Sequence, residues 1–213
     1  MSVLNRLASA LGRGDEAPNE ALAQEIAERR DTEAVRELIA HLNDKNKDIQ
    51  SDCIKVLYEV GAREPELIAD GVDEFIQLLG SRNNRLVWGG MTALGAIAPL
   101  RAAEIFQQID VIMKATDEGS VITQDWGVRV LAAVSAQSAP YEQRIFPFLL
   151  QFLRGCSPKD LPRHAESVLV AANAAFNATN RDDLLTVLEA RKDALKEAQR
   201  KRLEQVIRKI KAL

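Results

Sequence analysis

A repeat with a constant period constrains the fold of this chain more than any other feature. Four segments read VRELIAHLND, VDEFIQLLGS, IDVIMKATDE and FPFLLQFLRG, and each starts 37 residues after the one before. Their apolar positions stay in phase, so that Leu38, Phe75, Ile112 and Leu149 are equivalent, and only Thr116 interrupts the pattern. A fixed period of this length is typical of stacked helical hairpins, which form a solenoid. The sequence therefore predicts an all-α protein with four successive hairpins.

A second helix in each repeat keeps the same period. Equivalent leucines lie at Leu57, Leu94 and Leu131, each 37 residues after the last. The turns between the two helices of each hairpin are predicted at residues 43–48, 80–84, 117–120 and 155–162. One hairpin cannot bury the apolar faces of both its helices, whereas stacked hairpins share one continuous core.

Glycine and proline punctuate these second helices. Gly61, Pro99 and Pro140 are expected at or just beyond their C-terminal ends. Gly89 and Gly90 lie inside the second helix of repeat two, where glycine costs roughly 0.5–1 kcal/mol relative to alanine. Glycines in a helix interior therefore predict that close packing or ligand access compensates for this cost.

The two ends of the chain are predicted to cap the solenoid within the same single domain. Residues 1–30 form N-terminal capping helices, residues 31–180 form the four repeats, and residues 181–213 form a basic capping helix or hairpin. Asp31 is the predicted N-cap of the first repeated helix, and Gly12 closes a short helix before it. For the C-terminal segment we favour two helices over one long helix, because a hairpin covers an exposed solenoid end.

Charge is distributed unevenly along the chain. The net charge is −3, but residues 189–213 contain nine basic and four acidic residues, which leaves about −8 on the rest. The basic segment is either an anchor for an acidic partner, RNA or a membrane surface, or a solvated helix face with cations near its C-terminal dipole end. The acidic repeat region predicts no general attraction to nucleic acid.

Cysteine usage and hydropathy favour a cytoplasmic protein. Cys53 and Cys156 lie three repeats apart, too far in a solenoid for the roughly 7 Å that a disulfide allows between Cα atoms. Two cysteines at this spacing also indicate no metal site. No apolar run approaches the roughly 18 residues of a membrane span, and the N-terminus is too interrupted for a secretory signal.

The pattern VxxLIxxL at Val35, Leu38, Ile39 and Leu42 and the segment SRNNRLVWGGMTALGAIA at residues 81–98 resemble the HEAT family of helical repeats, with armadillo repeats as close relatives. The resemblance covers roughly residues 31–177. It implies a right-handed α-α superhelix of stacked hairpins, whose second helices line the concave surface where such proteins usually bind. The chain departs from the pattern at Arg85, where a small apolar residue is usual, and in the longer turn CSPKDLP.

Standard catalytic motifs are missing from the sequence. It contains no GxxxxGK[ST], GxGxxG, HExxH, CxxC or GxSxG, so we predict no catalytic residues, metal site or cofactor. The chain has two histidines, His41 and His164. His41 lies beside Leu42 on a first helix and is expected to be structural.

A candidate ligand-binding stripe lies at the starts of the second helices. Its members are Arg85, Trp88, Asp125, Trp126, His164 and Glu166. Trp88 and Asp125 are equivalent at the 37-residue period, and stacked helices lie about 10 Å apart, so these residues could form a ladder along one groove. Aromatic and arginine side chains are also typical of binding hot spots. Alternatively, the two tryptophans fill the core and the acidic groups stabilise helix N-termini.

These features favour a non-enzymatic protein-binding or scaffold module. The expected partner is a protein or peptide segment, with a basic one favoured by the acidic repeats. A weak homodimer through Leu203, Val206 and Ile210 is an alternative if that stripe is exposed. HEAT-like DNA glycosylases are the enzymatic alternative, with Trp88, Trp126 and Asp125 acting on a damaged base, although DNA binding requires a basic face. A HEAT-like phycobilin lyase would use His164 or Asp125.

Overall fold

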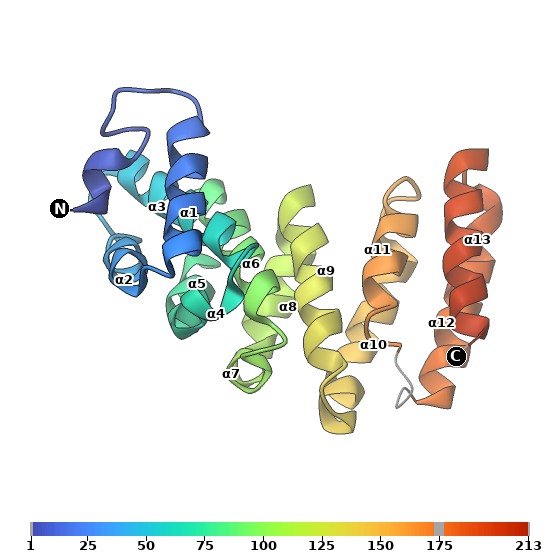
Figure 1. Cartoon of the computed structure of the whole chain (residues 1–213). Helices are drawn as coiled ribbons and strands as arrows, with labels where there is room; N and C mark the ends of the chain where they lie inside the picture. The colour runs from blue at the N-terminus through green and yellow to red at the C-terminus, as the bar shows by residue number, and fades with distance from the viewer. Residues whose placement is uncertain (1, 173–176, 213) are drawn as a thin grey trace. The chain divides into compact units, whose positions relative to one another are not determined.

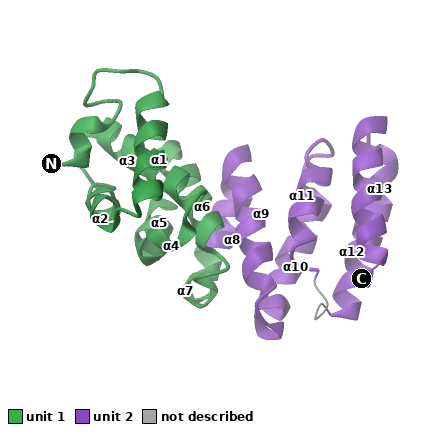
Figure 2. Cartoon of the chain, in the orientation of Figure 1, with its two compact units in different colours: residues 1–111 green, residues 112–213 purple. Residues whose placement is uncertain are grey.

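The computed structural model describes residues 2–172 and 177–212, and all regular elements in these ranges are helices. This confirms the predicted all-α class. The chain divides into two compact units, residues 1–111 (unit 1) and 112–213 (unit 2), with the boundary inside α8 (Ile109–Glu118; Figure 2). None of the described helices is long and apolar enough to cross a membrane. The division into capping segments and repeats stays a prediction.

Unit 1 contains the first two predicted hairpins. Its helices are α1 (Ala17–Arg29), α2 (Thr32–Ala40), α3 (Lys47–Gly61), α4 (Pro65–Ile68), α5 (Val72–Leu78), α6 (Asn84–Ile97) and α7 (Ala102–Gln107), with 3-10 turns η1 (Val3–Arg6) and η2 (Ala69–Gly71). The helix α3 packs between α1 and α6, while α2 packs on α3 and α5 packs on α6 (Figure 1). The first helices of repeats one and two are therefore α2 and α5, and their second helices are α3 and α6.

Unit 2 contains the later hairpins. Beyond the end of α8, its elements are α9 (Val121–Ser135), α10 (Ala139–Gly155), α11 (Leu161–Val168), α12 (Ala178–Arg191), η3 (Lys192–Ala194) and α13 (Glu197–Lys211). The helix α11 packs between α9 and α13, and α10 packs against α9 and α12 (Figure 1). The second helices of this unit, α9 and α11, thus form one layer with α13.

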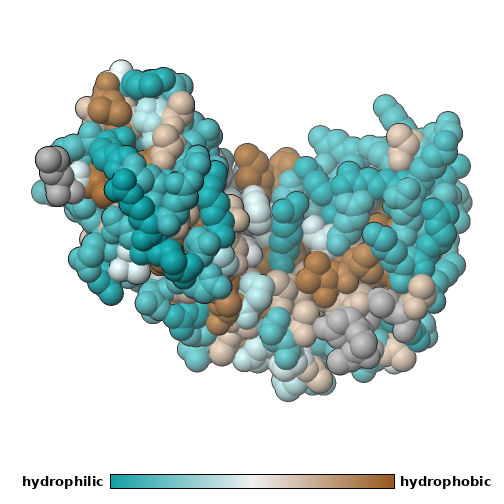
Figure 3. All heavy atoms as spheres, in the orientation of Figure 1, coloured by the Kyte–Doolittle hydropathy of each residue, from teal (hydrophilic) through white to brown (hydrophobic). Residues whose placement is uncertain are grey.

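The in-phase apolar positions form the core of each unit. Side chains with 0% exposure include Leu38, Phe75, Leu57 and Leu94 in unit 1, and Ile112, Leu149 and Leu131 in unit 2. Burying a side chain of this size contributes about 1.5–3 kcal/mol. Each repeat therefore gains a similar stabilisation from its in-phase apolar residues. Hydrophilic side chains cover most of the visible surface of both units (Figure 3).

Helix-capping residues follow the same period as the core. The side chains of Asn46, Asn83 and Ser120 each accept a backbone N–H at the start of α3, α6 and α9. They lie 37 residues apart, and each satisfies a donor that the first turn of a helix leaves free. The 37-residue spacing does not extend to the next second helix. Helix α11 begins at Leu161, 40 residues after the start of α9. The longer turn of repeat four moves this helix along the chain.

Helix α10 begins earlier than the repeat predicts. The repeat places its start at Phe146, but the helix starts at Ala139, where Ser138 accepts the backbone N–H of Tyr141. Pro140 therefore lies in the first turn of α10 and does not follow the end of α9 closely. Proline suits a first turn, because its missing N–H has no partner there to lose. In the earlier repeats the short helices α4 and α7, which the sequence did not predict, precede the first helix.

Glycines in α6 allow close helix packing, as expected. A Cβ atom on Gly89 would lie 2.7 Å from Cγ1 of Ile54, and one on Gly90 would lie 2.9 Å from the backbone oxygen of Phe75. Real Cβ atoms are not found so close to neighbouring atoms. The conformational cost of glycine is therefore offset by the approach of α3 and α5 to α6.

The ends of the chain confirm two predictions and correct one. Asp31 caps α2 by accepting the backbone N–H of Ala34, and the C-terminal segment forms two helices, α12 and α13. The predicted N-terminal helix closed by Gly12 is a single 3-10 turn, η1, followed by turns.

The apolar stripe of α13 does not meet the condition set for a homodimer. Leu203, Val206 and Ile210 are 0%, 2% and 0% exposed, because α13 packs on α11 and α12 within unit 2. The intramolecular hairpin thus covers the surface that a second copy would need.

Candidate functional site

Two aromatic rings lie side by side on the second helices of unit 1. Tyr58 comes from α3 and Trp88 from α6, and their ring centroids are 5.6 Å apart at an interplanar angle of 52°. Both side chains are half-buried. Tilted aromatic pairs contribute about 0.5–1.5 kcal/mol beyond their buried area. Trp88 therefore belongs to a partly exposed aromatic platform, and is neither wholly in the core nor wholly in solvent.

Lys55 places a cation beside this platform. Its Nζ atom lies 3.1 Å from Oε1 of Glu20, 2.9 Å from Oε1 of Glu59 and 5.2 Å from the centroid of the Tyr58 ring. Burial acts to lower the pKa of the lysine, but its hydrogen bonds to Glu59 and Glu20 outweigh burial and the pKa is raised. The ammonium therefore stays charged, and the ring face already holds a cation.

Glu59 contributes a paired carboxylate beside this platform. Burial acts to raise the pKa of Glu59, but hydrogen bonds from Arg63 and Lys55 outweigh it and the pKa is lowered. The ion pair from Arg63 Nη1 to Glu59 Oε2 measures 2.8 Å. We define the acidic-aromatic face of unit 1 as Glu16, Glu20, Tyr58, Glu59 and Trp88 with their resident cations Lys55, Arg63 and Arg85.

Arg85 joins the start of α6 to the segment before α1. Its backbone N–H donates to Oδ1 of the N-cap Asn83 at 3.0 Å, and its Nη2 atom donates to Oε1 of Glu16. The other carboxylate oxygen of Glu16 accepts Nδ2 of Asn19 at 3.1 Å. The charged residue that departs from the small apolar pattern is thus accommodated by an ion pair at the surface.

In unit 2 the structure brings together two predicted site residues, Asp125 and His164, with their neighbours Asp160 and Arg163. Arg163 Nη1 lies 2.9 Å from Oδ2 of Asp125 and its Nη2 lies 2.9 Å from Oδ1 of Asp160, which links α11 to α9. His164 Nδ1 lies 3.6 Å from Oδ1 of Asp125, too far for a hydrogen bond. Both of these atoms are buried without a hydrogen-bond partner in the described part of the chain. The rings of His164 and Phe152 meet in a T-shaped contact, with centroids 5.1 Å apart.

Burial of His164 predicts a pH-dependent stability. Burial lowers the pKa of the imidazole from its ordinary 6.5 to about 4, so the folded state keeps the ring neutral while the unfolded chain binds a proton below pH 6.5. Stability from this group is therefore complete above pH 6.5 and is lost as the pH falls from 6.5 towards 4. Urea unfolding of wild type and His164→Gln at pH 7.5, 6 and 5 measures it, and we expect the wild type to lose more stability over this range.

Asp125 acts with the opposite sign in the same experiment. Burial raises the pKa of its carboxyl group against the attraction of Arg163, so the folded state binds this proton more readily than the unfolded chain. Only the difference between wild type and His164→Gln isolates the histidine. An equal loss of stability in both proteins would contradict a buried neutral imidazole.

The other predicted residues of unit 2 have partners of their own. The guanidinium carbon of Arg129 lies 4.6 Å from the centroid of the Trp126 ring, a cation–π contact within α9. Glu166 accepts Nε and Nη2 of Arg202 at 2.6 and 2.5 Å, which fastens α11 to α13. These hydrogen bonds lower the pKa of Glu166.

The six predicted site residues are shared between the units. Arg85 and Trp88 lie in unit 1, and Asp125, Trp126, His164 and Glu166 lie in unit 2. The structure corrects one member, because His164 is 2% exposed and its burial leaves no ring surface for a ligand. Asp125 and Glu166 are not N-cap residues, since the N-cap residues of α9 and α11 are Ser120 and Asp160. The single stripe stays a prediction.

Sequence reasoning missed most of the acidic-aromatic face. Lys55 and Glu59 are four residues apart on α3, a spacing that indicates an ion pair on one helix face, and this signal was available. Tyr58 is equivalent to Gly95 at the 37-residue period, so the repeat gave no reason to select it. Glu16 and Glu20 lie outside the repeats, and only packing brings them to α3 and α6.

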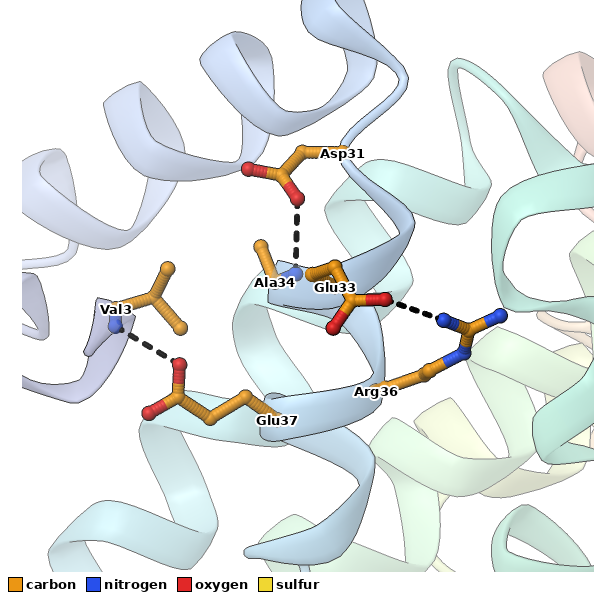
Figure 4. A pocket seen from close by; sticks show the side chains of 6 residues that line it. All are labelled: Val3, Asp31, Glu33, Ala34, Arg36 and Glu37. Atoms are coloured by element: carbon orange, nitrogen blue, oxygen red, sulfur yellow. Dashed lines mark hydrogen bonds and ion pairs between the residues drawn. The ribbon is translucent and has the colours of Figure 1, made fainter. Parts of the chain in front are cut away.

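A hollow between η1 and α2 in unit 1 is structural. It is lined by Val3, Asp31, Glu33, Ala34, Arg36 and Glu37 (Figure 4). Asp31 accepts Ala34 N–H at 3.0 Å and Glu37 accepts Val3 N–H at 3.1 Å. The bond to Glu37 fastens η1 to α2, the bond to Asp31 caps α2, and both carboxylates are thus occupied. In residues 2–172 and 177–212 no group of three or more acidic, histidine or cysteine side chains is arranged to hold a metal ion.

Comparison with known proteins identifies the fold. A designed armadillo repeat protein, YIII(Dq.V1)4CPAF in complex with peptide (KR)4, is 15% identical with a TM-score of 0.68, over 90% of this chain and 86% of that one. A computationally designed armadillo repeat protein for modular peptide recognition is 15% identical with a TM-score of 0.66, over 97% of each chain. A mutant of Kap121p is 18% identical with a TM-score of 0.65, over 90% of this chain and 20% of that one.

No known family profile matches the chain, and no curated protein matches it. The similarity to the solved repeat structures shows that the chain has the fold of an armadillo- or HEAT-like α solenoid. This confirms the class that the repeat predicted.

Proposed function

We propose that this protein is a non-enzymatic peptide-binding module whose acidic-aromatic face in unit 1 binds a basic, extended segment of another protein. The observation that carries the proposal is the Tyr58–Trp88 pair beside the ion-paired carboxylates of Glu16, Glu20 and Glu59, with a lysine ammonium already 5.2 Å from the Tyr58 ring centroid. A face that holds its own cations against carboxylates and an aromatic ring has the chemistry to hold those of a partner.

The charge of unit 1 supports a basic partner. Residues 1–111 contain 19 acidic and 12 basic residues, a net charge of −7, whereas residues 112–213 contain 12 acidic and 16 basic residues, a net charge of +4. A negative potential attracts a cationic segment and raises its association rate. The solved structure of a similar fold in complex with the peptide (KR)4 agrees with this partner chemistry.

The glycosylase alternative receives less support from the site. Asp125 would have to act on a damaged base, yet its carboxylate pairs with Arg163 at 2.9 Å and its side chain is 16% exposed. Trp88 lies in the unit of net charge −7, which would repel a phosphate backbone. We therefore expect no binding to duplex DNA at low salt, as judged by fluorescence anisotropy.

Replacing Trp88 with alanine is expected to weaken binding of the peptide (KR)4 about tenfold, within the range of aromatic hot spots. The loss follows because Trp88 supports Tyr58 and forms part of the platform. Anisotropy of a fluorescein-labelled (KR)4 peptide measures this loss, after circular dichroism shows that the variant folds.

Two controls make the experiment specific. Trp126→Ala in unit 2 is expected to change affinity less than twofold, because Arg129 already covers that ring. An acidic peptide of equal length should not bind. Equal affinity of Trp88→Ala and wild type, or equal binding of both peptides, would refute the proposed face.

A further inference from the structure

A hollow beside Arg85 extends the acidic-aromatic face towards the N-terminal segment. It has a volume of about 470 Å³, and its lining includes Ala8, Ser9, Arg13, Glu16, Asp52 and Arg85. It lies between the turns that follow η1, the first turns of α3 and the start of α6. The space next to the Arg85–Glu16 ion pair is thus open to an incoming side chain.

Hydrogen bonds hold the wall of this hollow in place. Asp52, 7% exposed, accepts Ser9 N–H at 2.8 Å and Asn19 Nδ2 at 2.8 Å, and Asn19 Oδ1 accepts Ala8 N–H at 3.0 Å. Arg13 pairs with Asp15 at 2.8 Å, so it does not neutralise the carboxylates of the hollow. The hollow is therefore formed before any partner binds. Its carboxylate Glu16 is paired with Arg85.

Arg85 is poorly satisfied in that position. In the described part of the chain its guanidinium makes one polar contact, with Glu16, although it has five N–H donors. Its Nε atom is buried without a hydrogen-bond partner, as is the hydroxyl of Ser9 in the same hollow. A desolvated donor without an acceptor is unfavourable. The ion pair itself is at the surface, where such pairs contribute little, since both side chains are 39% exposed.

We infer that Arg85 is a resident competitor: a lysine or arginine side chain of the partner segment replaces it on Glu16, and Arg85 turns out into solvent. This inference rests on the proposed function and assigns Arg85 the opposite effect from a binding contact. The displaced guanidinium regains water at Nε, and the incoming cation donates to Glu16. Arg85 would then set how basic a segment must be before it binds.

The test compares Arg85→Gln with Arg82→Gln for binding of labelled (KR)4. Arg82 is exposed, lies three residues earlier, and makes no ion pair among the residues that the structure describes, so its replacement removes the same charge without opening Glu16. We expect Arg85→Gln to bind about two- to fivefold more tightly than wild type, the range of an exposed ion pair. Arg82→Gln should change affinity less than 1.5-fold, roughly the effect of one screened surface charge.

Glu16→Gln tests whether the competition depends on the carboxylate of Glu16. It should weaken binding, and adding Arg85→Gln to it should give no further gain, because the competition needs the carboxylate. Weaker or unchanged binding by Arg85→Gln, while Trp88→Ala still loses affinity, would overturn the inference and leave the proposed function standing. Equal gains from Arg85→Gln and Arg82→Gln would also overturn it. If neither wild type nor Arg85→Gln binds the peptide, both proposals fail.

Discussion

Replacing Leu94 with alanine is expected to lower the free energy of unfolding by about 2–5 kcal/mol. Leu94 is 0% exposed on α6 and holds the same repeat position as Leu57 and Leu131, which are also 0% exposed. Its loss removes apolar burial and leaves a cavity that rigid neighbouring helices fill only in part. A repeat protein has little to compensate with, since each hairpin contacts only its neighbours.

Leu100→Ala is the matched control for this prediction. Leu100 lies just beyond α6 and is 47% exposed, so its truncation should change stability by no more than about 0.5 kcal/mol. Urea unfolding followed by Trp88 fluorescence in a Trp126→Phe background reports on unit 1 alone. A similar cost for both leucine variants would show that the in-phase positions are not the core.

Gly127→Ala is expected to lower the free energy of unfolding by about 1–3 kcal/mol, the range of overpacked cores. Helix propensity alone predicts a gain of roughly 0.5–1 kcal/mol for the same change. Packing wins because an added Cβ would lie 2.1 Å from Oγ1 and 2.8 Å from Cβ of Thr116. Thr116 is fully buried, and its hydroxyl donates to the backbone oxygen of Ile112 at 2.7 Å, so it cannot easily move away.

Gly155→Ala should have the opposite sign. Gly155 is the last residue of α10, and an added Cβ there would meet no atom within 4 Å. The variant should be neutral or stabilised by up to about 1 kcal/mol, because alanine restricts the unfolded chain. Thermal unfolding by circular dichroism orders the two variants. A Gly127→Ala protein as stable as wild type would refute the close contact of α8 and α9.

The close approach of Gly127 to Thr116 explains why Thr116 breaks the repeat pattern. Thr116 stands where the other repeats have leucine, and it is buried all the same. Its hydroxyl finds an acceptor in its own helix, one turn back, which is how a buried threonine avoids an unpaired donor. The small glycine opposite it allows the two helices to approach. The repeat pattern identified Thr116 as an exception, but it could not identify Gly127 as the residue that packs against it.

Prediction of the candidate site was partial for a physical reason. Trp88 and Arg85 were found because they start a repeated helix, which is a local property. Their partners, Tyr58 and Glu16, lie 30 and 69 residues earlier, and no spacing within a repeat encodes such contacts. His164 shows the reverse error, since its position in the repeat indicated a groove while packing against Phe152 buried it.

What the sequence alone determined is the class of fold, the register of the first three hairpins, the positions of their core residues and the N-cap Asp31 of the first repeated helix. These follow from helix geometry and side-chain burial, which repeat every 37 residues. What only the tertiary structure decided is the early start of α10, the late start of α11, and which charged groups meet. Those depend on contacts between residues far apart in the chain, where free energy is set by packing and desolvation rather than by local pattern.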